Sequence, residues 1–146
     1  MDQQGDRDME YGKAFIGGFL ATLIFHQGVY ALFFAVGADL PAPPFNMTAT
    51  APLGIPAVLS LAFWGGVWGI PIWLMIRNAR SAGYWGRALV LGALLPSAVA
   101  LFIVFPIKGL GVAGGWNPQV IIGALILNGA WGIGLALFMR LTTARS

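Results

Sequence analysis

The chain has 146 residues, of which 58% are hydrophobic and only 9% are charged, and its mean hydropathy is +0.80. This composition excludes a soluble domain and indicates an integral membrane protein. The net charge of +3 lies at the ends of apolar segments, so it is read as a topology signal, and no nucleic-acid partner is expected. The chain contains no cysteine and one histidine, which excludes disulfides, thiolate metal sites, an ordinary zinc site and bis-histidine haem ligation within one chain.

The first apolar segment, residues 13–36, is long enough to cross a bilayer. A helix rises about 1.5 Å per residue and has to cover about 30 Å of hydrocarbon. The acidic start of the chain is the reverse of a basic secretory signal, so we expect this helix to be retained. The segment carries His26 and Gln27 near its middle, where polar side chains are costly unless they find partners.

A proline-rich loop follows the first apolar segment, and three further apolar segments complete the chain. A short basic turn and a glycine-rich loop separate these segments. The expected fold is all-α: an integral membrane bundle of four transmembrane helices that forms a single transmembrane domain over residues 1–146. The predicted spans are residues 14–36, 57–76, 88–107 and 120–139.

Lysine and arginine are distributed unequally between the two sides of this four-span arrangement. One side carries seven basic residues, and the other carries only Lys108. Basic residues accumulate on the cytoplasmic side of membrane proteins, so both termini are predicted to be cytoplasmic. The seven are Arg7, Lys13, Arg77, Arg80, Arg87, Arg140 and Arg145.

The second and fourth spans share a repeated pattern. Residues 66–70 (GVWGI) match residues 129–133 (GAWGI) at a constant offset of 63, and the first and third spans match more weakly. Both halves would begin and end on the same side, which predicts two parallel helical-hairpin repeats. The alternative is coincidence, because glycine, tryptophan and isoleucine are common in membrane spans.

Small residues on these two spans predict close helix packing. Gly65 and Gly69 form a GxxxG step, and Ala124, Asn128 and Gly132 form its counterpart in the fourth span. Asn128 places an amide near the middle of its span, and an interhelical hydrogen bond is the simplest interpretation of it.

Polar residues near the centres of the spans form the candidate functional site. One hypothesis is that His26, Gln27, Ser97 and Asn128 line a small midplane cavity that handles protons or a ligand. Thr22 and Tyr30 flank the histidine at a spacing of four residues, so the first helix has a polar ridge. The alternatives are a buried histidine satisfied by a neighbour, and a histidine that ligates a cofactor.

The face of the first helix opposite His26 is made of small residues, Ala14, Gly17, Ala21 and Gly28. If the polar ridge faces the bundle, this small face is free to pack against another chain, which predicts a homo-oligomer.

The sequence gives little support to an enzyme. It has no intramembrane carboxylate pair and no GxSxG, HExxH or P-loop motif. No catalytic residue, metal site or resident cofactor is predicted.

Four segments, FLATLIFHQG, PLGIPAVLSLAFWGGVWG, PIKG and GGWNP, together resemble a group of small, functionally uncharacterised four-span inner-membrane proteins of proteobacteria. The resemblance implies a bacterial inner-membrane location and brings no function with it. We expect a non-enzymatic accessory or structural membrane protein, acting as a homo-oligomer or within a larger membrane complex. The alternatives are an oligomeric transporter or channel with a midplane polar site around His26, and a binder of a hydrophobic cofactor such as quinone or haem.

Overall fold

The computed structural model describes residues 2–143, and helices make up most of that range. Four helical segments in it are long and apolar enough to cross a membrane. The all-α membrane bundle expected from composition is therefore confirmed. The four segments are Gln3–Ala35, Ala57–Ile76, Ser81–Ile107 and Pro118–Thr143.

The first helical segment is continuous through α1 (Gln3–Ala21), the π-helical turn η1 (Thr22–His26) and α2 (Gln27–Ala35). It begins well before the apolar run because Asp2 caps it, with Oδ1 of Asp2 accepting a hydrogen bond from the Gly5 N–H at 2.7 Å. The wider π turn contains His26 at its last position.

The loop after α2 folds back onto the start of the next helix. It contains a small antiparallel hairpin of β1 (Ala49–Thr50) and β2 (Ile55–Pro56), which leads directly into α3 (Ala57–Ile76). The backbone N–H of Val58 in α3 also donates to the Asn46 carbonyl at 2.9 Å. The proline-rich sequence therefore forms an ordered cap on one end of α3.

The second half begins with α4 (Ser81–Val99), which continues through the π-helical turn η2 (Ala100–Val104) into α5 (Phe105–Ile107). A short turn labelled α6 (Ala113–Trp116) precedes the last helix, α7 (Pro118–Thr143). Two glycines in α6, Gly114 and Gly115, adopt positive φ angles of 63° and 74°, which glycine accepts without steric cost.

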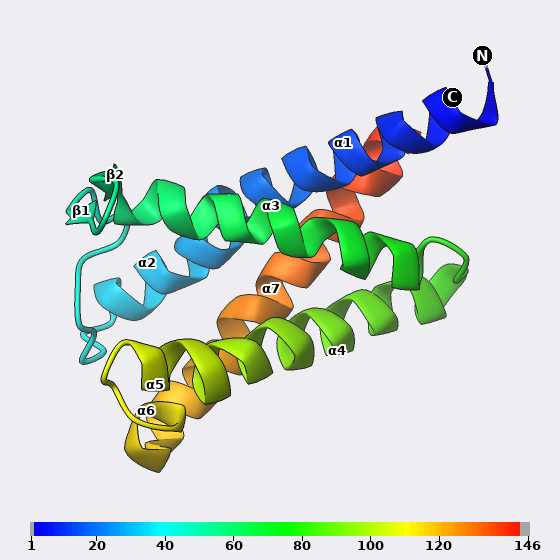
Figure 1. The fold of residues 1–146 in the computed structure, drawn as a ribbon. Helices are drawn as coiled ribbons and strands as arrows, with labels where there is room; N and C mark the ends of the chain where they lie inside the picture. Colours follow the sequence, from blue (N-terminus) through cyan, green and yellow to red (C-terminus); the bar gives the residue numbers. More distant parts are fainter. Residues whose placement is uncertain (1, 144–146) are drawn as a thin grey trace.

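Helices α1 and α3 pack along each other, α4 packs along α7, and α1 also packs against α7 (Figure 1). The start of α1, the end of α7 and the α3–α4 turn lie at one end of the bundle, called the turn end below. The β-hairpin, α5 and α6 lie at the opposite end, called the loop end. Arg145, which contributes to the count of basic residues, lies outside the described residues.

The main hydrophobic core lies toward the turn end. Its members come from the middle and the last residue of α1, the end of α3, the start of α4 and the second half of α7. They are Ala14, Ala21, Ile72, Trp73, Ile76, Tyr84, Ala88, Trp131, Leu135, Ala136 and Met139.

Within the first hairpin, α1 and α3 approach closely at glycines. A Cβ atom added to Gly18 would overlap the carbonyl oxygen of Gly65 and lie 3.1 Å from the Gly69 Cα. A Cβ atom on Gly69 would overlap the carbonyl oxygen of Ala14. Backbones can come this near only where side chains are absent or very small.

The second hairpin makes the same contacts at equivalent positions. A Cβ atom on Gly92 of α4 would lie 2.8 Å from the Gly132 Cα and 3.1 Å from the Asn128 carbonyl oxygen. A Cβ atom on Gly132 would overlap the carbonyl oxygen of Ala88. The parallel between Gly69–Ala14 and Gly132–Ala88 is geometric support for two hairpin repeats.

The expectation of a free small-residue face on α1 is wrong for three of its four residues. Ala14, Gly17 and Ala21 are buried inside the chain, and a Cβ on Gly17 would lie 2.6 Å from Cδ1 of Phe138 in α7. Gly28 alone has open space around it. Helices α3 and α7 both pack on α1 and cover this face. The small-residue face is therefore no longer a reason to expect a homo-oligomer.

Candidate functional site

The polar residues expected near the span centres fall into two separate hydrogen-bonded groups. The first joins α4 and α7: Nδ2 of Asn128 donates to Oγ of Ser97 at 2.9 Å, and Oγ of Ser97 donates to the Ala124 carbonyl at 3.1 Å. Ser97 is 1% exposed, so the hydroxyl is buried between the helices. The structure thus gives Asn128 an interhelical hydrogen bond.

The second group joins His26, Gln27 and the loop after α2. Oε1 of Gln27 accepts a hydrogen bond from the backbone N–H of Phe45 at 2.8 Å. Nε2 of the same amide lies 3.4 Å from Nδ1 of His26. Among the described residues, no hydrogen bond links this group to Asn128 or Ser97.

These contacts determine which nitrogen of His26 carries the proton. A backbone N–H can only donate, so the atom of Gln27 that faces Phe45 has to be the carbonyl oxygen. The amide nitrogen then faces His26 and donates, so Nδ1 accepts and the neutral ring carries its hydrogen on Nε2. Every buried side-chain nitrogen and oxygen in residues 2–143 has a hydrogen-bond partner. Nε2 of His26 has no partner among these residues, so it is not one of the buried atoms. Its N–H therefore reaches the surface of the chain.

The other two residues of the predicted polar ridge each have a separate structural role. Oγ1 of Thr22 donates to the Gly18 carbonyl at 3.0 Å within the same helical segment. A Cβ atom added to Gly65 of α3 would overlap this Oγ1 atom of Thr22. The hydroxyl of Tyr30 donates to the Ala42 carbonyl at 2.9 Å and ties the loop to α2. Thr22, His26 and Tyr30 therefore share no hydrogen-bond partner among the described residues.

Sequence reasoning missed two buried hydrogen bonds that connect helices. Nε1 of Trp131 in α7 donates to the Gly18 carbonyl at 2.9 Å, and the hydroxyl of Tyr84 in α4 donates to the Ala136 carbonyl at 2.6 Å. Tryptophan in the repeated GxWG pattern was the available sign of the first bond. The second had no such sign, because a tyrosine near a span end reads equally well as an interfacial residue.

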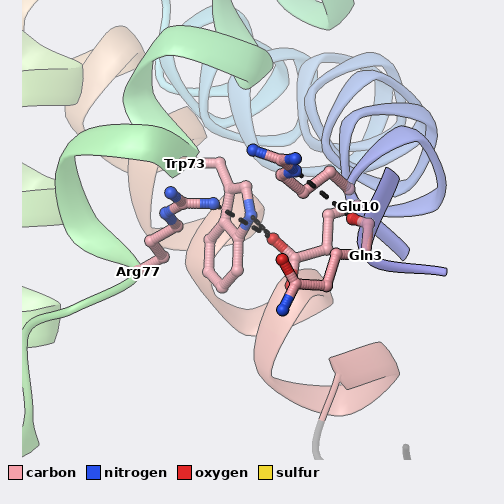
Figure 2. A network of polar contacts seen from close by, with 5 residues as sticks. Gln3, Glu10, Trp73 and Arg77 are labelled. Carbon is pink, nitrogen blue, oxygen red and sulfur yellow. Dashed lines mark hydrogen bonds and ion pairs between the residues drawn. The ribbon is translucent and has the colours of Figure 1, made fainter. Parts of the chain in front are cut away.

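A further polar network lies at the turn end, where Glu10 of α1 meets α3 (Figure 2). Oε2 of Glu10 lies 3.4 Å from Nη1 of Arg77 and accepts a hydrogen bond from Nε1 of Trp73 at 3.4 Å. Nearby, Nζ of Lys13 donates to the Thr142 carbonyl of α7 at 3.2 Å. These contacts attach the charged start of α1 to the bundle.

The described side chains also bear on whether the chain could hold a metal ion. Within residues 2–143, no group of three or more histidine, cysteine or acidic side chains is placed to hold a metal ion. The structure therefore defines a close-packed helical membrane bundle whose internal polar groups bind one another. Comparisons with protein-family models, with curated proteins and with solved structures found no match to this chain.

Proposed function

We propose that this protein is a non-enzymatic structural or accessory subunit of a bacterial inner-membrane complex. One observation carries the proposal: among residues 2–143, every buried side-chain nitrogen and oxygen has a hydrogen-bond partner. Polar side chains that serve a substrate or ion path inside a membrane face the bundle interior or a water-filled cavity. Buried polar groups such as Ser97 instead hold the helices together.

The outer surface of the bundle gives such a subunit somewhere to bind. Large apolar side chains are exposed on α3, including Phe63 at 49% and Trp64 at 58%. In a bilayer this surface faces lipid or the helices of a partner, and helix association there depends on packing and not on hydrophobicity. The partner class is therefore another integral membrane protein.

The proposed placement has both termini and the α3–α4 turn in the cytoplasm. It rests on the seven-to-one distribution of basic residues between the two sides. The structure gathers the start of α1, the end of α7 and the α3–α4 turn at one end, as this placement requires (Figure 1).

Site-specific photo-crosslinking in the native membrane tests the proposed role. A photoreactive residue at Trp64, which is exposed, should give one discrete adduct with a larger membrane protein. The same residue at Ile72, which is 0% exposed, is the matched control on α3 and should give none. Lipid adducts alone would contradict the proposal, and an adduct at twice the 15.5 kDa chain mass would replace it with a homo-oligomer.

One observation favours a second candidate, the binding of a hydrophobic ligand that carries a carbonyl oxygen, such as a quinone. The Nε2–H of His26 is a donor that reaches the surface of an apolar segment, and a quinone carbonyl is a suitable acceptor. Titration with a short-chain quinone, followed by tryptophan fluorescence, should show saturable quenching that His26→Leu abolishes. Thr22→Ala on the same helix should retain it, and equal quenching of all three proteins would exclude this function.

A further inference from the structure

A groove lies between the end of α3 and the beginning of α4 at the turn end. Its volume is about 480 Å³, and it is open to its surroundings, so it is a shallow surface groove and not an enclosed pocket. Apolar side chains and one glycine form most of the lining, and one arginine adds a positive charge. The lining residues are Met75, Gly86, Arg87, Val90 and Leu91.

Arg87 and Arg80 both lack an ion-pair partner within the described chain, but only Arg87 lines the groove. Arg77 pairs with Glu10, and the guanidinium of Arg140 lies 5.8 Å from the centroid of the Tyr84 ring. Arg87 makes no ion pair or hydrogen bond with any of residues 2–143. Its guanidinium therefore has its full set of donors available to an anion.

The depth of the groove suits a lipid headgroup above an acyl chain. Arg87 lies six residues after Ser81, the first residue of α4, which corresponds to about 9 Å along the helix. Val90 and Leu91 follow one turn deeper into the span. An arginine at this depth extends toward the membrane surface while its aliphatic stem covers apolar neighbours.

Gly86 keeps the groove open. A Cβ atom at this position would meet no atom within 4 Å, so the space beside it is unfilled. Gly83, one turn earlier on α4, has equally open surroundings but does not line the groove. The two glycines therefore form a matched pair for testing whether the groove itself has a role.

From the apolar lining and the unpaired arginine, we infer that this groove binds one anionic phospholipid. The phosphate of the headgroup accepts hydrogen bonds from the guanidinium of Arg87, and one acyl chain lies along Val90, Leu91 and Met75. Basic pockets between transmembrane helices are suited to anionic headgroups because attraction and chain burial act together. The acidic side chains described at the turn end lie on α1 or at its N-cap, Asp2, and none of them lines the groove. Glu10, which reaches α3, is paired with Arg77.

Native mass spectrometry of the full chain, titrated with phosphatidylglycerol and with phosphatidylcholine of identical acyl chains, tests this site. The affinity of the wild type for the first phosphatidylglycerol molecule should be about fivefold higher than its affinity for the first phosphatidylcholine molecule. This is the factor expected for one arginine near an anionic headgroup. Arg87→Gln should reduce phosphatidylglycerol binding to the phosphatidylcholine level. Gly86→Leu should weaken the binding of both lipids, because the added side chain fills the groove.

Two controls keep the test independent of net charge and of folding. Arg7→Gln removes the same charge from an exposed position on α1 and should leave the preference unchanged. Gly83→Leu adds the same side chain to α4 outside the groove and should bind both lipids like the wild type. Equal affinity of the wild type for the two lipids, or equal loss in Arg7→Gln and Arg87→Gln, would overturn the site.

Discussion

At the scale of single residues, the polar side chains of the spans act as local connectors. Asn128 joins Ser97 across the α4–α7 contact, while Gln27 joins His26 to the loop through Phe45. Within the described chain, no hydrogen bond joins the two groups, so one group can change without exposing unpaired atoms in the other. A residue pair that shares a hydrogen bond should be energetically coupled, and a pair that does not should be independent.

Double-mutant cycles should separate these cases. Ser97→Ala and Asn128→Ala should show a coupling energy of about 0.6 to 1.7 kcal/mol, the average and the maximum found for side-chain hydrogen bonds between membrane helices. His26→Leu and Asn128→Ala should be additive within about 0.5 kcal/mol, because no hydrogen bond joins them. Free energies of unfolding measured in mixed micelles provide the check. Strong coupling between His26 and Asn128 would contradict this separation and would support the hypothesis of a single midplane cavity.

At the scale of helices, the two hairpins have equivalent glycine contacts, but the equivalent arginine at the turn end has a different partner in each hairpin. Arg77 and Arg140 are equivalent at the offset of 63 residues, and both lie at the turn end. Arg77 meets the carboxylate of Glu10 in α1, whereas Arg140 lies over the ring of Tyr84 in α4. Glu10 and Tyr84 are equivalent because each lies four residues before an alanine that contacts a glycine of the partner helix. The two alanines are Ala14 and Ala88. An ion pair in one half thus corresponds to a cation–π contact in the other.

Glycine-to-alanine substitutions should show where the helices touch. Gly132→Ala places a Cβ atom against the backbone of Ala88, so it should lower the free energy of unfolding by about 1–3 kcal/mol. Gly123→Ala, on the same helix and with no atom within 4 Å, should leave stability unchanged or slightly higher. Thermal unfolding in detergent compares the two variants. Equal melting temperatures would show that Gly132 does not lie at a helix contact.

On the scale of the whole molecule, the bundle is better packed at its turn end than at its loop end. Most of the buried apolar side chains belong to the core near the α3–α4 turn, whereas the loop end is held largely by backbone bonds of the 37–56 segment. Six of the seven described basic residues lie at the same end as the core, and Lys108 lies at the loop end. The asymmetry of charge therefore coincides with an asymmetry of packing.

Reporter fusions should reveal the orientation. Reporters after Ala79 and at the C-terminus should give cytoplasmic signals, and reporters inserted near Asn46 and Gly114 should give signals from the opposite side. The physical reason is the retention of lysine and arginine on the cytoplasmic side during insertion. A C-terminus found outside would contradict the four-span arrangement.

The architecture was predictable because apolar length is a strong pattern, and a contact such as Gly69 with Ala14 was foreshadowed by the GxxxG spacing. The grouping of the polar residues was not predictable. The position of a residue in its own span does not reveal which way the helix faces or how helices cross. The bond between Gln27 and Phe45 depends on a loop that folds back, and no periodicity encodes that return.

The unequal lengths of the helices have a consequence for the kind of bilayer that suits this protein. Helix α3 has 20 residues and covers about 30 Å, whereas Gln3–Ala35 has 33 residues and covers about 50 Å. The longer segment adapts to membrane thickness by tilting or by extending into water, but α3 has no such reserve between its proline-rich start and Arg77. The shortest of the four spanning segments therefore sets the hydrophobic mismatch, and a thickened bilayer would strain α3 before any other part of the molecule.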